Sequence, residues 1–163
     1  MTNPGKRFER KFSESIPDGV FCIRIPDKVY LLNGKTYSEE TEADFIASDG
    51  THTYLIECKA TSSRSLRRDS VRPHQERSLS EFDSLGDNAH GVLAVEFYDK
   101  AGYRKPKRMF LLPIGRWFTF WKIVPSRSSM PIHAFESMAY EVPYSKGAYR
   151  FNELRRPLDE RFD

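Results

Sequence analysis

The sequence predicts a mixed α/β or α+β domain built around a central sheet. Apolar residues make up 39% and aromatic residues 13% of the 163-residue chain, which is too rich for a disordered protein and enough to bury a core. The apolar patterns follow the order helix, several strands, helix, two or three strands. We expect a single domain over residues 1–163, with a core at about residues 5–123 and a C-terminal extension at 124–163.

The first elements are bounded by prolines. A helical pattern covers Lys6–Ser15 and ends near Pro17. Strand-like runs follow at Val20–Ile25 and, after the break at Pro26, at Val29–Leu32. We therefore expect a helix followed by two short strands.

Turn residues separate the next strands. Asn33-Gly34 predicts a turn, and the polar run Lys35–Glu42 that follows predicts an exposed excursion from the domain. Two strand-like runs, Ala43–Ala47 and His52–Ala60, flank Asp49-Gly50, a dipeptide typical of tight hairpins. These two runs are the clearest strand pair in the chain.

The second helix begins after a basic loop. The loop, Thr61–Arg72, is rich in serine and arginine, and Pro73 is well suited to the first turn of a helix. Apolar residues then recur at intervals of three until Gly86, at Leu79, Phe82 and Leu85.

The last elements are two strands and an aromatic segment. Strands are expected at Gly91–Tyr98 and Arg108–Pro113, joined by a loop that contains Gly102. The run Trp117–Trp121 alternates in the manner of a strand and favours a core position over base stacking. Asn152–Arg156 suggests one last turn of helix in an otherwise uncertain tail.

The charge pattern is consistent with a polyanionic partner. The 26 Lys and Arg residues exceed the 23 Asp and Glu residues by only three, so the distribution matters more than the total. Cations cluster in two segments, which are Arg64, Arg67, Arg68, Arg72 and Arg77, and Arg104, Lys105, Lys107 and Arg108. Such clusters suit a phosphate backbone, although two ordinary solvated loops explain them equally well.

Several classes of protein are not expected. No run approaches the ~18 apolar residues of a membrane span, and no apolar run follows the polar start of the chain as it would in a secretory signal. Cys22 and Cys58 form neither a disulfide framework nor a zinc motif, and the four histidines lack metal-ligand spacing. We expect a protein of the cytoplasm with no membrane partner.

The hairpin around Asp49-Gly50 places charged residues on one face. If that dipeptide is a two-residue turn, Asp44 pairs with Leu55. Because strand side chains alternate, Glu57 and Lys59 then share the face of Asp44, whose Cβ atom lies about 7–8 Å from that of Glu57. The opposite face carries residues suited to packing on a helix, which are Phe45, Ala47, Ile56 and Cys58.

Two carboxylates at that separation can hold one divalent cation. Mg²⁺ suits Asp44 and Glu57 because it takes few protein ligands and keeps several waters. Lys59 beside them can orient a water or stabilise the charge of a phosphate, as phosphodiester hydrolysis requires. The alternative is a set of surface ion pairs. The apolar run Tyr54-Leu55-Ile56 leads directly into Glu57, which indicates a buried acid and favours the metal site.

The order of these motifs resembles a known enzyme family. The matching segments are Gly5-Lys6-Arg7-Phe8-Glu9, Glu42-Ala43-Asp44-Phe45, Ile56-Glu57-Cys58-Lys59-Ala60, Pro73-His74-Gln75, the strand from Gly91 to Phe97, and Phe118-Thr119-Phe120-Trp121. Together they resemble the RecU-type Holliday junction resolvases of bacteria, members of the PD-(D/E)XK nuclease superfamily. Archaeal resolvases have a similar order of acids.

The resemblance implies a fold, an activity and a site. The fold is restriction-endonuclease-like, with a central mixed sheet flanked by helices. The activity is paired cutting of four-way or branched DNA by a homodimer with Mg²⁺ or Mn²⁺, in the cytoplasm of a bacterial or phage-infected cell. Asp44 and Glu57 become metal ligands, Lys59 the catalytic cation, and Glu9 and Gln75 further site residues. The DNA-binding residues expected with this site are Lys6, Arg64, Arg67, Arg68 and Arg72.

Two features limit the resemblance. Family members carry a longer stalk before the site aspartate, where this chain offers only Lys35–Glu42. The same catalytic core also serves nucleases that cut flaps, mismatches or duplex DNA. A DNA-binding recombination accessory protein without catalysis is a further alternative, although the intact Asp44, Glu57 and Lys59 argue against it.

Overall fold

The computed structural model describes residues 3–99 and 107–151. Its centre is a six-stranded sheet in the order β1-β4-β5-β7-β8-β10. The strands are β1 (Phe21–Arg24), β4 (Phe45–Ser48), β5 (Thr53–Thr61), β7 (Ala89–Phe97), β8 (Arg108–Pro113) and β10 (Tyr140–Val142). Strands β5 and β7 are parallel and the other neighbours antiparallel, so the sheet is mixed, as predicted.

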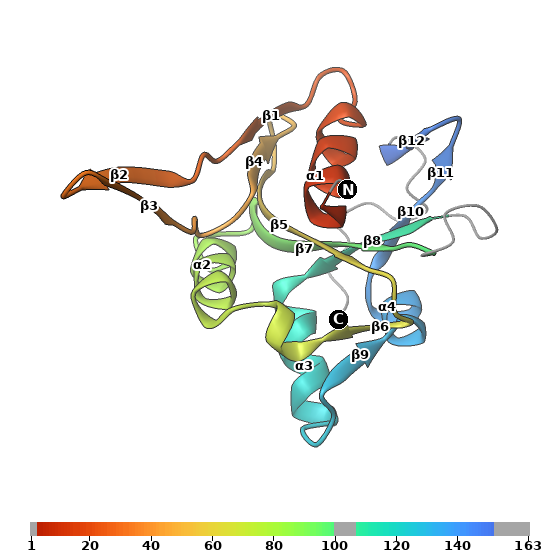
Figure 1. The fold of residues 1–163 in the computed structure, drawn as a ribbon. Helices are drawn as coiled ribbons and strands as arrows, with labels where there is room; N and C mark the ends of the chain where they lie inside the picture. Colours follow the sequence, from red (N-terminus) through yellow and green to blue (C-terminus); the bar gives the residue numbers. More distant parts are fainter. Residues whose placement is uncertain (1–2, 100–106, 152–163) are drawn as a thin grey trace.

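Helices cover both faces of the sheet. Helix α1 (Pro4–Glu14) lies on one face, while α2 (Pro73–Asp83), α3 (Ile114–Ile123) and α4 (Ile132–Met138) lie on the other (Figure 1). The chain therefore buries two apolar clusters, one on each face. The predicted architecture, a central mixed sheet flanked by helices, is confirmed.

Helix α1 packs on the sheet through two phenylalanines. Phe8 and Phe12 are 0% and 1% exposed and contact the cluster formed by Phe45, Ile56 and their neighbours. Asn3 caps the helix, since its side-chain oxygen accepts a hydrogen bond from the Gly5 amide at 2.9 Å. The predicted helix at Lys6–Ser15 is thus confirmed to within two residues of its start.

Helix α2 lies directly on β7. Gly91 makes this possible, because a Cβ atom at that position would lie 2.1 Å from the carbonyl oxygen of Leu79. Leu79 is itself fully buried in the cluster on this face. This close approach fixes α2 over the centre of the sheet, and with it Gln75 in the first turn of the helix.

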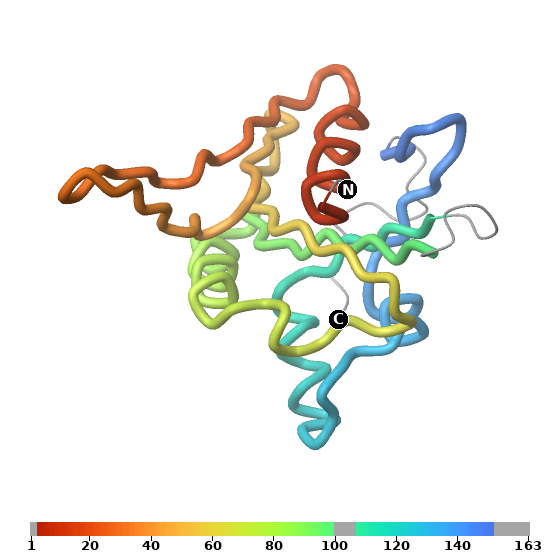
Figure 2. The backbone as a smooth tube through the Cα atoms, viewed as in Figure 1, coloured from red at the N-terminus to blue at the C-terminus, as the bar shows by residue number. Residues whose placement is uncertain are grey.

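The excursion predicted at Lys35–Glu42 contains one of the two strands of a projecting arm. Strand β2 (Lys28–Leu32) pairs with β3 (Lys35–Glu39) in a two-stranded sheet of their own, which projects from the domain beside β4 and α2 (Figures 1 and 2). All residues of both strands are exposed. Asn33 and Gly34 have φ angles of 50° and 74°, as a tight hairpin turn requires. The projection is longer than expected, because Val29–Leu32 belongs to it.

The aromatic segment is a helix and not a strand. Residues Trp117–Trp121 lie within α3, where the buried residues are Ile114, Trp117, Phe120 and Trp121. Their spacing of three and four is that of one helix face. Trp117, Thr119 and Trp121 alternate with Phe118 and Phe120, which suggested a strand. Because four of these five side chains are large and aromatic, they also fit the spacing of a helix. The expected core position is confirmed.

The basic loop contains short secondary structure. Strand β6 (Ser65–Arg67) pairs with β9 (Ser129–Pro131), and a 3₁₀ turn follows at Arg68–Ser70. The remaining strands, β11 (Tyr144–Ser145) and β12 (Ala148–Tyr149), form a small hairpin on the α1 side. Gly102 and Asn152–Arg156 lie outside the described residues. Within residues 3–99 and 107–151, no helix has the length and apolar character needed to cross a membrane.

Candidate active site

The β4–β5 hairpin has a wider turn than predicted. Phe45 pairs with Ile56 and Ser48 with Thr53, which leaves four residues, and not two, in the turn. The side chain of Asp49 stabilises this turn by accepting hydrogen bonds from the Thr51 and His52 amides at 2.9 and 2.7 Å. The predicted pairing of Asp44 with Leu55 is therefore wrong.

The register is displaced by two residues, which preserves the faces. Extending the observed pairing by one residue places Asp44 opposite Glu57, and the Asp44 amide donates to the Ile56 carbonyl oxygen at 2.9 Å. A displacement by two keeps every side chain on its face, whereas a displacement by one would not. The predicted packing face is confirmed, since Phe45, Ala47, Ile56 and Cys58 all join the cluster beneath α1.

Asp44 lies half-buried at the edge of β4. Its Oδ2 atom accepts a hydrogen bond from the Cys58 amide at 2.8 Å. Desolvation raises the pKa of the Asp44 carboxyl group, an effect that the Cys58 hydrogen bond partly offsets. The negative charge of Glu9 raises the pKa further, and Lys59 lowers it.

Glu57 is almost fully buried. It is 4% exposed, and its Oε1 atom accepts hydrogen bonds from Gln75 Nε2 at 2.7 Å and from Lys59 Nζ at 2.8 Å. Burial, and after it the charge of Asp44, raises the pKa of Glu57 to about 7, although Lys59 acts in the opposite direction. A buried acid whose pKa is raised further by a neighbouring carboxylate lies in an environment that favours a cation.

Gln75 connects Glu57 with Lys59. The amide oxygen of Gln75 accepts hydrogen bonds from Lys59 Nζ at 3.1 Å and from the Arg72 amide at 3.0 Å, while its nitrogen donates to Glu57. Only this orientation of the side-chain amide satisfies all three contacts. The first turn of α2 thus holds the carboxylate of Glu57 and the ammonium group of Lys59 together.

Glu9 faces the same site from α1. Glu9 lines one groove with Arg24 and with Phe45, the residue that follows Asp44, and its charge raises the pKa of both Asp44 and Glu57. Lys6 and Arg24 each pair with its Oε2 atom at 3.3 Å. Sequence reasoning missed Arg24, which lies on β1 next to the strand of Asp44. The signal available was an arginine within an otherwise apolar strand.

The donor set fits Mg²⁺ in particular. Within the described residues, no group of three or more His, Cys, Asp or Glu side chains is arranged to hold a metal ion. Mg²⁺ commonly uses one or two carboxylates with waters for its other ligands, so Asp44 and Glu57 are sufficient. In the same part of the chain, neither Oδ1 of Asp44 nor Oε2 of Glu57 takes part in a hydrogen bond. An ion held by Asp44 and Glu57 would have Glu9 in its surroundings and not among its direct ligands.

Three of the predicted DNA-binding arginines line one groove at the start of α2. Arg67, Arg68 and Arg72 lie there together with Ser128 and Ser129. Each arginine has a partner within the chain. Arg67 pairs with Asp69, Arg68 lies 5.0 Å from the centroid of the Trp121 ring, and Arg72 pairs with Glu40 at 2.7 Å.

The other two predicted DNA-binding residues lie elsewhere. Arg64 lines a separate groove together with Arg108. Lys6 lines a third groove with Arg10 and Arg24, next to Glu9. The structure therefore places cations in several grooves, one of which adjoins Glu9 and another the helix start that carries Gln75.

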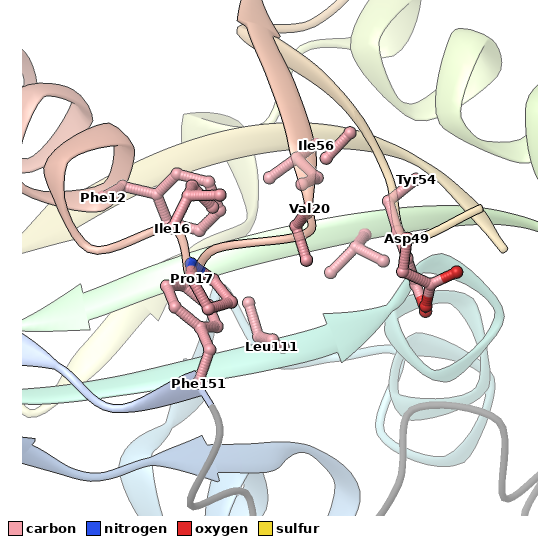
Figure 3. A pocket seen from close by; sticks show the side chains of 11 residues that line it. Phe12, Ile16, Pro17, Val20, Asp49, Tyr54, Ile56, Leu111 and Phe151 are labelled. Carbon is pink, nitrogen blue, oxygen red and sulfur yellow. The ribbon is translucent and has the colours of Figure 1, made fainter. Parts of the chain in front are cut away.

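An apolar pocket on the α1 side does not contribute to the site. It lies between the end of α1 and the sheet, where Phe12, Val20, Ile56 and Leu111 line it and Asp49 lies at its edge (Figure 3). None of Asp44, Glu57, Lys59 and Gln75 lines this pocket. Apart from Glu9 on α1, the candidate site residues lie away from this pocket, on the α2 side of the hairpin.

Comparison with solved structures found distant likenesses, one of which is to an archaeal protein. No protein-family model and no curated protein sequence matches the chain. The chain is similar to the structure of Hjc from Archaeoglobus fulgidus, a Holliday junction resolvase, with a TM-score of 0.46 and 19% identity. The alignment covers 82% of this chain and 93% of the archaeal one. At this level of identity, the activity of the chain has to be argued from its own residues.

Proposed function

We propose that this protein is a Mg²⁺-dependent DNA endonuclease of the PD-(D/E)XK superfamily that resolves four-way junctions. The observation that carries the proposal is the pairing of Asp44 with Glu57 across β4 and β5, with Lys59 and Gln75 in contact with Glu57. A buried acid of raised pKa beside a second acid is costly unless a cation compensates it. Acids with strongly raised pKa values are found mainly at functional sites.

The residues have separate tasks in phosphodiester hydrolysis. Mg²⁺ held by Asp44 and Glu57 would supply Lewis-acid chemistry, which polarises a phosphate oxygen and acidifies a water molecule. Lys59 is placed to stabilise the negative charge that develops on the phosphate oxygens or to orient the attacking water. Gln75 keeps the ammonium group and the carboxylate in register by contacting both.

The arginine groove at the start of α2 supports a DNA substrate. Arg72 lies on the chain segment that leads into Gln75, so a phosphate bound in this groove would lie close to the catalytic residues. The partners of Arg67 and Arg72 are exposed carboxylates, and such exposed ion pairs contribute little to stability. DNA phosphates can therefore replace them at small cost.

Resolution of a junction requires two sites, and we propose that the protein acts as a homodimer through its arm. The arm exposes five large apolar side chains, Val29, Tyr30, Leu31, Leu32 and Tyr37. An isolated two-stranded sheet is marginally stable, so a covering surface would stabilise it. The segment 27–42 carries both Lys28 and Lys35 and the acids Asp27, Glu39, Glu40 and Glu42. This mixture suits a second copy better than a phosphate backbone.

The substrate class is tested with matched DNAs. The protein is incubated with Mg²⁺ and with four-way, Y-shaped and linear DNAs of the same arm sequence. We expect symmetrically paired cuts in the four-way junction, and cutting of the other two that is slower by at least about tenfold, or 1.4 kcal/mol in activation free energy. Equal cutting of all three would exclude a resolvase and leave a general nuclease. Binding without cutting in both Mg²⁺ and Mn²⁺ would favour the accessory protein.

A further inference from the structure

A second acid of the sheet is completely buried. Glu96 lies on β7, is 0% exposed, and faces the α1 side. Its Oε1 atom accepts a hydrogen bond from Arg7 Nη2 at 2.9 Å, and its Oε2 atom accepts one from the hydroxyl group of Tyr149. A buried carboxylate that lacked these donors would be strongly destabilising. Both of its oxygens are thus engaged by residues from other elements.

The two donors hold helix α1 in place. Arg7 belongs to α1, and the ring of Tyr149 meets the ring of Phe8 edge to face at 6.1 Å between centroids. The Tyr149 amide also donates to Ser15 Oγ, just after the helix, at 3.0 Å. The β11–β12 hairpin therefore contacts α1 near its start and at its end, while Glu96 ties the helix to the sheet.

The orientation of α1 determines where Glu9 lies. Arg7 and Glu9 are two residues apart, which separates their directions by about 200° around a helix. Arg7 can therefore face Glu96 while Glu9 pairs with Arg24 on β1 and lines a groove with Phe45, the residue next to Asp44. Glu96 lies opposite Ala60, the residue that follows Lys59 on β5. A rotation or a shift of α1 would move Glu9 away from the two other acids.

We propose that Glu96, acting with Tyr149, is a positioning residue that sets Glu9 beside the Mg²⁺ site. This inference rests on the proposed function and adds a role for the C-terminal hairpin in it. Among the described residues, the Glu9 carboxylate forms ion pairs with Lys6 and Arg24, whose side chains are 56% and 41% exposed. Exposed pairs of that kind contribute too little to hold a helix. The buried contacts of Glu96 are the stronger restraint.

Tyr149→Phe is the primary test, because it removes the hydroxyl donor and keeps the ring against Phe8. We expect the Mg²⁺ concentration for half-maximal cutting to rise threefold to tenfold, near the lower end of effects seen for residues around metal ligands, roughly tenfold to 100-fold. The rate at saturating Mg²⁺ should stay within about twofold of wild type. The Mg²⁺ dissociation constant, measured by calorimetry without DNA, should rise by the same factor.

The matched control is Tyr144→Phe in the same hairpin. Tyr144 pairs with Tyr149 across β11 and β12, and in the described part of the chain its hydroxyl group makes no hydrogen bond. Its removal should leave both Mg²⁺ constants unchanged. Glu96→Gln is a second variant, which removes the charge beside Arg7, and it should change both constants in the direction of Tyr149→Phe.

A double-mutant cycle separates positioning from general destabilisation. If Tyr149 acts through Glu9, Tyr149→Phe should have no further effect on Mg²⁺ affinity in a Glu9→Gln background. Additive losses, or a folded Tyr149→Phe protein with wild-type Mg²⁺ affinity, would overturn the inference while leaving the nuclease proposal intact. A wild-type protein that neither binds Mg²⁺ nor cuts DNA would overturn both.

Discussion

At the scale of single residues, the proposed chemistry depends on Glu57. This carboxyl group is buried, accepts hydrogen bonds from Gln75 and Lys59, and has a pKa raised to about 7 by burial and by Asp44. Glu57 and Asp44 are more stable as anions when a positive charge lies between them, so this pair of acids favours a bound cation. The first two predictions address this pair.

Asp44→Asn and Glu57→Gln should each reduce cutting by more than about 100-fold, the upper end of losses seen for residues around metal ligands. Junction binding should change little, because these substitutions remove proposed metal ligands and not phosphate contacts. Cleavage is measured under single-turnover conditions, and binding in Ca²⁺ by mobility shift. Cleavage at the wild-type rate by either variant would contradict the metal assignment.

The stability of the metal-free protein should decrease as the pH rises from about 4.5 to about 7. The pKa of Glu57 is raised from 4.5 to about 7 in the folded state, so folding favours its protonated form and loses stability as the group ionises. The loss is on the order of 3 kcal/mol at most. Scanning calorimetry in EDTA from pH 5 to 8 measures it. Glu57→Gln should flatten the curve, and Mg²⁺ should stabilise the wild type most at the upper end. Parallel curves for the two proteins would contradict the prediction.

At the scale of elements, the site depends on how α2 follows the basic segment. The close approach of α2 to Gly91 fixes the helix, and Gln75 in its first turn then reaches both Glu57 and Lys59. The same segment places Arg67, Arg68 and Arg72 in one groove. The contacts of the proposed active site and the candidate phosphate contacts are therefore positioned by one continuous piece of chain.

Replacing Arg67 and Arg68 together with alanine should weaken junction binding and reduce its salt dependence. Each lost phosphate contact lowers the slope of log K against log salt by about 0.9, so the slope should fall by roughly two. The matched control replaces Lys146 and Arg150, which belong to the hairpin on the α1 side. Binding is measured by fluorescence anisotropy from 50 to 300 mM salt. Equal slopes for wild type and the Arg67/Arg68 variant would show that these two arginines do not contact DNA phosphates and are ordinary solvated charges.

At the scale of the whole molecule, the arm formed by β2 and β3 is the feature whose surface the rest of the described domain leaves exposed. It carries exposed apolar side chains next to the strand that begins after Asp44, and its base is connected to α2 through the pair of Glu40 and Arg72. A partner on the arm would therefore lie close to the active site. Two copies arranged in this way would present two sites to one junction.

Leu31→Lys should convert a dimer into a monomer, because Leu31 is 73% exposed on the arm. Leu85→Lys is the matched control, since Leu85 is 74% exposed but lies just after α2. Light scattering after size exclusion gives the mass between about 1 and 100 µM, a range that corresponds to dissociation free energies of roughly 5 to 8 kcal/mol. A wild-type mass near the 19.0 kDa of one chain throughout would exclude the dimer.

Local patterns were sufficient to predict most of the architecture and one face of the hairpin. The helices at Lys6–Ser15 and after Pro73, and the strand character of His52–Ala60, follow from periodicity and from proline and glycine positions. The predicted register was wrong by two residues. Because side-chain alternation has a period of two, the prediction that one face carries Asp44, Glu57 and Lys59 is still correct. The strand expected at Trp117–Trp121 is a helix, because four of these five residues are large and aromatic and fit either period.

The sequence by itself determined that two acids and a lysine share one face of a strand pair, because this depends only on alternation along the chain. The tertiary structure alone decided the rest: the opposition of Asp44 and Glu57, the contacts of Gln75 with both Glu57 and Lys59, and the burial of Glu96 between Arg7 and Tyr149. These depend on the width of a turn, on one close helix approach and on contacts between residues far apart in the chain. Such features arise from packing, for which a linear pattern carries no signal.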